Sequence, residues 1–183
     1  MRSKIKSILR SLEKTRGQYW NISPDFGTFL NILIKTLNLK KVIEVGTSDG
    51  YSGIWMAEAL SKTKGRLWTI ESHTKERFSL AEINFKKAGL SNYITQWKGH
   101  APEIIPKNPG VFDMVFLDAT KTEYSLYFDS LKNHVKKNGL LVADNTVSHR
   151  KELLPFIKKI STDKKWRVTE FKFGSGFLVA VKI

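Results

Sequence analysis

Three short polar segments, each preceded by an apolar run, carry side chains that could do chemistry. They extend from Glu44 to Gly50, from Asp118 to Lys121, and over Asp144 and Asn145. The preceding runs are rich in β-branched residues and predict buried strands. Open α/β sheets bind ligands beyond the carboxyl ends of their strands, so the three segments can meet in one crevice. Each segment alone is a weak signal, but their order along the chain predicts a cofactor loop and a metal-dependent reaction centre.

Asp118, Asp144 and Asn145 form the candidate metal site. The chain contains no cysteine, so a bound metal must take oxygen or imidazole ligands. Two carboxylates and a carboxamide suit octahedral Mg²⁺, which keeps positions open for water and substrate oxygens, and Mn²⁺ or Ca²⁺ are alternatives. Taken alone, an Asp-Asn pair is more often a turn or a helix cap. Lys121 would reach a substrate atom at the metal, and act as its base, if Asp118 starts a helix; otherwise it is a solvated lysine.

A glycine-rich turn from Gly46 to Gly53 separates an expected strand from an expected helix. Glycines let the backbone approach a ligand, and the helix N-terminus favours a negatively charged group. The spacing is not the G-x-G-x-x-G of dinucleotide enzymes, which argues against NAD. Glu71 stands roughly 20 residues further on, where an acidic residue commonly accepts ribose hydrogen bonds. An adenosine ligand without a diphosphate points to S-adenosylmethionine, although Glu71 taken alone could simply open a surface loop.

The hydrophobic period switches repeatedly between strand and helix along the chain. Strands are expected over residues 40–45, 66–70, 93–97, 113–117 and 140–143, and helices over 24–37, 51–60, 75–88, 123–135 and 152–161, with a short helix near Glu103. Two further β-like runs, 166–173 and 176–181, are joined by a short glycine-containing turn and predict a hairpin. The resulting fold is α/β, a doubly wound Rossmann-like sheet of seven strands, mostly parallel with an antiparallel C-terminal hairpin strand.

Composition predicts a single cytoplasmic domain over residues 1–183. No apolar run is long enough to span a membrane, and no apolar signal core stands at the N-terminus. Residues 1–20 predict a basic amphipathic helix that docks on the domain or on a second subunit, which allows a homodimer; membrane-surface binding is the alternative. The net charge of +14 favours contact with phosphates, although scattered lysines also describe an ordinary solvated basic surface.

Residues 42–52, 116–121 and 143–145 together resemble the cation-dependent class I O-methyltransferases, which include catechol O-methyltransferase, plant caffeoyl-coenzyme A O-methyltransferases and small bacterial relatives. The resemblance covers residues 21–182. It implies that Asp118, Asp144 and Asn145 bind the metal and that Lys121 is the base. The methionine end of S-adenosylmethionine would lie at Gly46, Ser52 and the backbone near Ile22, with the ribose at Glu71 and the adenine at the turn of His100 and Ala101. The complete expected cofactor site comprises Ile22, Glu44, Gly46, Ser52, Glu71, His100, Ala101 and Asp118.

The resemblance implies metal-dependent methyl transfer from S-adenosylmethionine to a hydroxyl oxygen of a catechol-like or other phenolic small molecule. Some small bacterial members instead methylate hydroxyuridine in tRNA, and the basic charge keeps that alternative open. A non-catalytic adenosine-ligand-binding module is a third reading, against which the intact metal and base residues argue. The pattern departs from the family in three places. Leu178 stands where animal catechol enzymes place a carboxylate, residues 146–154 lack the longer plant-type loop, and His100 replaces an acidic residue and could be merely structural.

Overall fold

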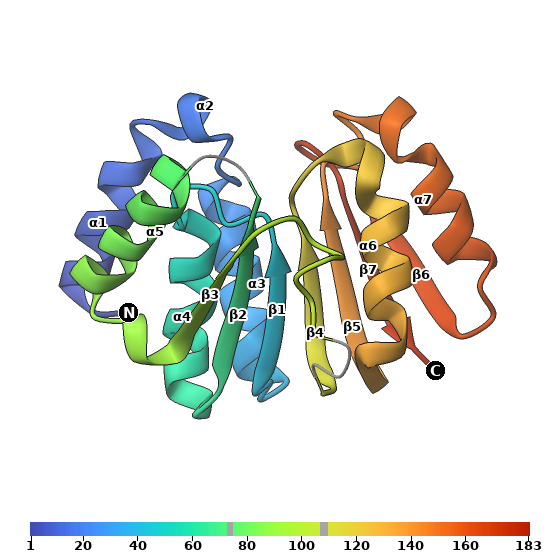
Figure 1. Ribbon diagram of the computed structural model, residues 1–183, viewed down its shortest axis with the longest axis horizontal. Helices are drawn as coiled ribbons and strands as arrows, with labels where there is room; N and C mark the ends of the chain where they lie inside the picture. The colour runs from blue at the N-terminus through green and yellow to red at the C-terminus, as the bar shows by residue number, and fades with distance from the viewer. Residues whose placement is uncertain (73–74, 107–109) are drawn as a thin grey trace.

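A single sheet of seven strands, in the order β3-β2-β1-β4-β5-β7-β6, organises the protein (Figure 1). The computed structural model describes residues 1–72, 75–106 and 110–183. The strands are β1 (Lys41–Val45), β2 (Arg66–Glu71), β3 (Ile94–Lys98), β4 (Phe112–Leu117), β5 (Val135–Asp144), β6 (Trp166–Phe171) and β7 (Phe177–Lys182). The helices are α1 (Ser3–Glu13), α2 (Arg16–Tyr19), α3 (Pro24–Thr36), α4 (Tyr51–Thr63), α5 (Lys75–Ala88), α6 (Tyr124–Leu131) and α7 (Arg150–Thr162), with short 3₁₀ helices η1 (Ser91–Tyr93), η2 (Lys121–Glu123) and η3 (Lys132–His134).

The strand order reverses direction at β1. Strands β2 and β3 extend the sheet on one side of β1, while β4 and β5 extend it on the other, and all these pairs are parallel. Only β7 runs antiparallel to its neighbours, β5 and β6. The predicted seven-stranded, mostly parallel sheet with an antiparallel hairpin strand is therefore confirmed. In such sheets ligands bind at the reversal, beyond the carboxyl ends of the central strands.

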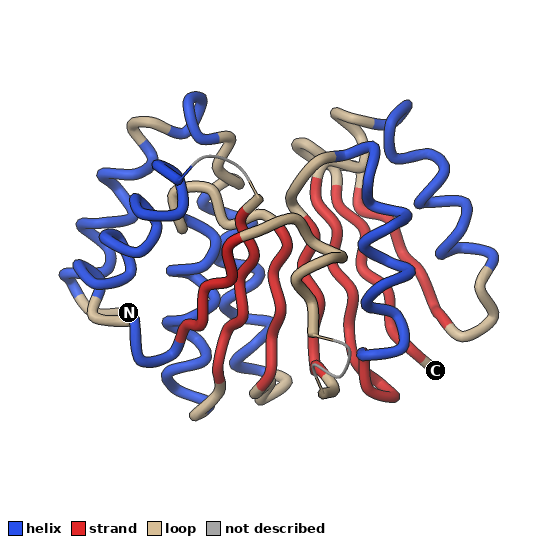
Figure 2. Tube along the Cα trace, in the orientation of Figure 1, coloured by secondary structure: helices blue, strands red, loops and turns tan. Residues whose placement is uncertain are grey.

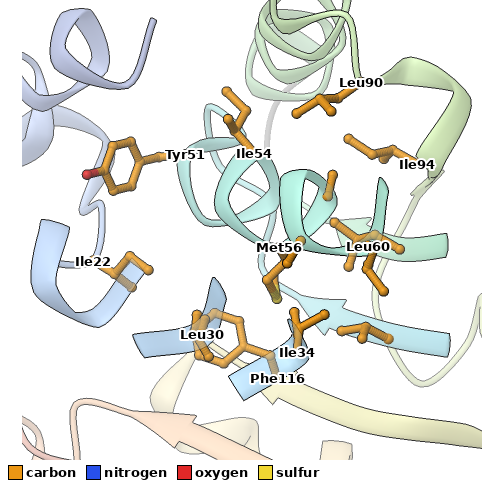
Figure 3. Close-up of a cluster of buried hydrophobic side chains, with 14 of the residues drawn as sticks. Ile22, Leu30, Ile34, Tyr51, Ile54, Met56, Leu60, Leu90, Ile94 and Phe116 are labelled. Carbon is orange, nitrogen blue, oxygen red and sulfur yellow. The ribbon is translucent and has the colours of Figure 1, made fainter. Parts of the chain in front are cut away.

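Alternating side chains on the central strands feed two separate cores. On β4, Met114 and Phe116 join the cluster that includes α3 and α4, whereas Val115 and Leu117 join the cluster that includes α6 and α7. Figure 2 shows the strands between these two groups of helices. In the first cluster Leu30 and Phe116 are both fully buried (Figure 3). Burial on both faces explains why the strands read as nearly continuous apolar runs.

Two predicted helices are wrong in part. The helix expected over 123–135 is present as α6 and then as the 3₁₀ helix η3, which ends at His134, so it fails only at Val135, where β5 begins. Val135 is buried and pairs with Phe112. Sheet pairing therefore overrides the apparent helical period there. The short helix expected near Glu103 is absent, because residues 101–105 form turns. Pro102 and Pro106 lack backbone N–H donors and leave too few residues between them for a helix.

The predicted N-terminal helix is divided into α1 and α2. The Thr15 hydroxyl donates a hydrogen bond to the carbonyl of Leu12 at 3.1 Å, and this bond closes the last turn of α1. Ile5 and Leu9 are buried in the same cluster as α3 and α4, so α1 packs on the body of the protein. The next helix begins as expected, since the Ser23 hydroxyl accepts a hydrogen bond from the N–H of Phe26 at 3.1 Å. No helix in the described part of the chain combines the length and apolarity needed to cross a membrane.

A buried ion pair fastens α3 to α4 and gives a stability prediction. Glu58 is 2% exposed, and its carboxylate accepts hydrogen bonds from Lys35 at 2.7 Å and Asn31 at 2.9 Å. Burial opposes ionisation, but these two donors outweigh it and lower the pKa of Glu58. Replacing Glu58 with Gln should lower the free energy of unfolding near pH 7 by about 1–3 kcal/mol. Because wild type loses this stabilisation as the carboxylate protonates, the difference should shrink as the pH falls below the ordinary glutamate pKa of 4.5.

Urea unfolding over a pH series measures this effect. The matched control is Glu82→Gln, which removes an exposed carboxylate on α5 and should change little at either pH. A stability loss in Glu58→Gln that is equally large at acidic and neutral pH would contradict the role given to the ionised carboxylate.

Candidate active site

A cavity of about 640 Å³ lies at the carboxyl ends of β1, β2 and β4. Residues 16–22, between α1 and α3, form one of its walls. The cavity brings together most of the predicted site residues, namely Ile22, Gly46, Ser52, Glu71, Ala101, Asp118, Lys121 and Asn145. The other three, Glu44, His100 and Asp144, are not part of its lining but contact residues next to it. One hollow therefore joins the predicted cofactor loop to the predicted metal and base residues.

Gly46 allows the cofactor loop to pass directly over the end of β4. Its φ of +104° lies in the region that favours glycine, and a Cβ built there would be 2.0 Å from the carbonyl oxygen of Asp118. The N–H of Asp118 in turn donates to the carbonyl of Val45 at 2.9 Å. No side chain fits between the two segments, so the loop and Asp118 have fixed relative positions.

Glu71 is held to the cofactor loop through its carboxylate. It ends β2, is 5% exposed and accepts a hydrogen bond of 2.6 Å from the backbone N–H of Ser48. The Ser48 hydroxyl donates to the carbonyl of Tyr19 at 2.8 Å, which ties the same loop to the N-terminal wall. A carboxylate fixed at the rim of the cavity can accept hydrogen bonds from a ligand's hydroxyl groups without further ordering.

Glu44 lies beneath the cavity rather than in its wall. Its carboxylate is fully buried and accepts hydrogen bonds from Ser52 at 2.5 Å and Thr69 at 2.6 Å. Burial raises the pKa of Glu44 to about 8. Ser52 lines the cavity, so Glu44 fixes the position of a hydroxyl group in the cavity wall.

Lys121 reaches Asp118 without the helix that the sequence suggested. Residues 118–120 form a loop, and Lys121 begins the 3₁₀ helix η2. Its ammonium group donates to the Asp118 carboxylate at 2.8 Å and to the Tyr124 hydroxyl at 3.2 Å. Tyr124 is itself anchored by a 3.1 Å hydrogen bond to the carbonyl of Leu117. The amine therefore points into the cavity beside Asp118, held by a buried tyrosine.

Asp144 and Asn145 follow β5 at the same edge of the sheet. Asp144 is 3% exposed, and its carboxylate accepts a 3.0 Å hydrogen bond from the Ser175 hydroxyl. Burial and then the nearby negative charge of Asp118 raise the pKa of Asp144. Among the described residues, no three acidic, histidine or cysteine side chains form a metal cluster. Asp118, Asp144 and the Asn145 amide nevertheless supply an all-oxygen donor set, which suits a hard divalent cation.

His100 does not face the cavity. Its Nδ1 lies 2.6 Å from Glu103 and its Nε2 lies 2.8 Å from Glu123, and these partners, Glu123 first, raise the pKa of the imidazole. Glu123 also accepts a 2.5 Å hydrogen bond from Tyr127, which does line the cavity. Both ring nitrogens of His100 therefore serve to tie the turn at Ala101 to η2. This geometry matches the structural alternative, while a contact between His100 and an adenine ring stays a prediction.

The sequence did not reveal several residues of the cavity. Trp20 is 69% exposed, and the guanidinium of Arg77 lies 4.7 Å from its ring centroid in a cation–π contact. Asn21 donates to the buried carboxylate of Asp49 at 3.0 Å, which joins the N-terminal wall to the cofactor loop. His149 lines the cavity beside Asn145. These pairings join residues far apart along the chain, so no local sequence pattern could have indicated them.

Comparisons with known proteins agree with this geometry. A family profile described as O-methyltransferase matches residues 2–183. The chain belongs to this family. It is 38% identical over 137 residues to a catechol O-methyltransferase of Niastella koreensis, covering 73% of this chain and 61% of that one. It is 36% identical over 159 residues to caffeoyl-CoA O-methyltransferase 1 of Zea mays, covering 82% and 61%. This member of the family therefore spans about three fifths of the length of those relatives.

Solved structures agree on the fold. An O-methyltransferase from Bacillus cereus, in complex with SAH, gives a TM-score of 0.87 at 24% identity, covering 100% of this chain and 92% of that one. At this level of identity the likeness establishes the fold alone. Together with the family profile, it confirms the family resemblance and the Rossmann-like sheet that the sequence predicted for this O-methyltransferase family member.

The buried carboxyl of Glu44 gives a pH-dependent prediction. Between its ordinary pKa of 4.5 and its raised pKa of about 8, the folded protein retains a proton that the unfolded chain loses. Wild type should therefore lose stability as the pH rises through this window, whereas Glu44→Gln, which cannot ionise there, should not lose this contribution. In urea unfolding measured in EDTA, the free energy of unfolding of the variant should rise relative to that of wild type as the pH increases. Parallel pH profiles for the two proteins would show that Glu44 does not titrate in this range.

Proposed function

We propose that the protein transfers a methyl group from S-adenosylmethionine to a hydroxyl oxygen of a small phenolic molecule, with a divalent cation bound at the site. The observation that carries this proposal is the single cavity that joins Gly46 and Glu71 to Asp118, Lys121 and Asn145. Methyl transfer requires both reactants to be held together in a near-attack arrangement, and a shared cavity provides that condition.

The cofactor would occupy the part of the cavity formed by the ends of β1 and β2. Glu71 is placed there to accept hydrogen bonds from the ribose hydroxyl groups. Ser52 and the backbone at Ile22 and Gly46 would bind the methionine end, and Ala101 would lie against the adenine. The structure from Bacillus cereus shares this fold and is in complex with SAH, which supports an S-adenosyl compound as the cofactor class.

Asp118, Asp144 and Asn145 would hold the cation. The donor set fits, because three oxygen donors from two strand ends leave positions open for an acceptor's hydroxyl groups. When bound, Mg²⁺ or a similar cation lowers the pKa of a hydroxyl group that it coordinates, and S-adenosylmethionine supplies the methyl group. The names of the curated relatives, catechol and caffeoyl-CoA O-methyltransferases, support a vicinal dihydroxy aromatic as the acceptor class.

Lys121 is the residue placed to remove the acceptor's proton. Its amine lies in the cavity wall, 2.8 Å from Asp118 and therefore beside the proposed cation site. The hydrogen bond to Tyr124 keeps the amine in that position. Tyr124, which holds the amine, is itself fully buried. We expect an acceptor hydroxyl bound at this site to lie within hydrogen-bond reach of Lys121.

A methyl-transfer assay tests the proposal. Labelled S-adenosylmethionine should transfer its methyl group to catechols or caffeoyl-type phenols, and EDTA should abolish transfer until excess Mg²⁺ restores it.

Undermodified tRNA belongs in the same panel, because the +14 charge favours a phosphate-rich acceptor. Activity on tRNA should fall steeply as salt rises, since counterion release weakens phosphate binding, whereas activity on a phenol should not. Full activity in EDTA would exclude the cation, and cofactor binding without transfer to any acceptor would favour a binding module.

Substitution of Lys121 separates proton transfer from cation binding. Lys121→Ala should still bind Mg²⁺ and the cofactor but lose kcat by roughly 10²–10⁴-fold, the usual contribution of a general base. Raising the pH should partly restore the rate, because solvent can then take over removal of the proton. Asp144→Ala is the comparison, since it removes a proposed ligand and should weaken cation binding itself. Near wild-type kcat in Lys121→Ala at neutral pH would mean that the lysine is not the base.

A further inference from the structure

We propose that Ser175, in the turn between β6 and β7, is a positioning residue for the cation site and acts through Asp144. The inference rests on the proposed function, because it concerns the affinity of the site for a divalent cation. The Ser175 hydroxyl is the only side chain in the described ranges recorded as donating to Asp144, at 3.0 Å. It therefore fixes one oxygen of a nearly buried carboxylate that the chain presents at the end of β5.

The backbone of the turn is fastened to the segment that follows Asp144. The carbonyl of Ser175 accepts hydrogen bonds from the N–H groups of Val147 at 2.9 Å and Ser148 at 3.0 Å. The carbonyl of Gly176 accepts one from Thr146 at 3.0 Å. Three backbone hydrogen bonds thus hold the turn against the chain just after Asp144 and Asn145. The position of the Ser175 hydroxyl is consequently set by the backbone and not by the serine rotamer alone.

The turn also cannot slide along the sheet. Asp144 pairs with Phe177 in the antiparallel register of β5 and β7, which places Ser175 two residues beyond that pair. Gly176 has a φ of +72°, and a Cβ built there would lie 2.6 Å from the backbone nitrogen of Val147. Only glycine permits this contact, so the turn packs directly on the backbone after Asn145. A shift in register would carry the hydroxyl away from Asp144.

The chemistry of the donor favours a role in cation binding. Asp144 lies near Asp118, so the two carboxylates repel each other, and Asp118 already has the ammonium of Lys121 at 2.8 Å. A neutral hydroxyl orients Asp144 without adding a second positive charge that would compete with a cation. Outer-shell hydrogen bonds of this kind typically contribute 10–100-fold to metal affinity. Ser175 is exposed, so a slightly larger hydroxyl side chain can replace it without a clash.

Electron paramagnetic resonance of free Mn²⁺, titrated into the full chain without cofactor, tests the proposal. Ser175→Ala should bind Mn²⁺ roughly 10–100-fold more weakly than wild type, while Ser175→Thr, which keeps a hydroxyl, should remain close to wild type. Affinity for S-adenosylmethionine should not change in either variant. In steady-state assays the Mg²⁺ concentration for half-maximal rate should rise by the same factor in Ser175→Ala, with kcat at saturating Mg²⁺ retained.

Ser61→Ala is the matched control, because it also deletes a hydroxyl that donates a hydrogen bond, in this case to the carbonyl of Glu58, on α4 and outside the cavity lining. Its Mn²⁺ affinity should equal that of wild type. Unchanged Mn²⁺ affinity in Ser175→Ala, alongside weakened binding in Asp144→Ala, would overturn the role of Ser175 and leave the proposed function standing. Failure of the wild type itself to bind Mn²⁺ would instead overturn the cation site and this inference together.

Discussion

The contact between the backbones of Gly46 and Asp118 is the constraint on which the rest of the site depends. At that point β1 and β4 end side by side, and only a hydrogen atom fits between the loop and the carbonyl of Asp118. The two strands are rigid because both of their faces are buried in separate cores. The same close approach therefore fixes the cofactor loop on one side and the lysine-bearing turn on the other. The two halves of the site cannot move independently, as near-attack positioning of two reactants requires.

Around that contact the acidic groups are held mainly by neutral donors. Hydroxyl groups hold Glu44, a backbone N–H holds Glu71, and an amide holds Asp49. Asp118 has a cationic partner, Lys121. Neutral donors orient these carboxyl groups without adding positive charge, so those that are ionised keep the edge of the sheet attractive to positive charge. Glu44, whose pKa is raised to about 8, adds no charge there near pH 7. A sulfonium cofactor and a divalent cation both carry positive charge, and this edge lies within a chain whose overall charge is +14.

Much of this arrangement could be predicted from the sequence, because its signals are local. Strand runs that end in Glu44, Asp118 or Asp144 place those residues at one edge once the strands are parallel. The predictions from the sequence failed where pairing between segments far apart in the chain decides the local structure. The sequence alone predicts Val135 as the end of a helix, whereas in the structure it pairs with Phe112 in the sheet. It predicts His100 as a cavity residue, whereas in the structure its ring contacts Glu123. The domain boundary and the roles assigned to individual site residues stay predictions.

The antiparallel course of β7 has a consequence for the order in which the site assembles. The proposed cofactor half draws on residues up to the Ala101 turn and on the backbone of Asp118, so its parts are in place once β4 pairs with β1. The proposed cation half is completed only when β7 pairs with β5 and brings the β6–β7 turn against Asp144. That pairing spans more than thirty residues of chain and is among the slower kinds of contact to form. In this fold the proposed cation half is therefore the last part of the site for which the chain supplies its residues.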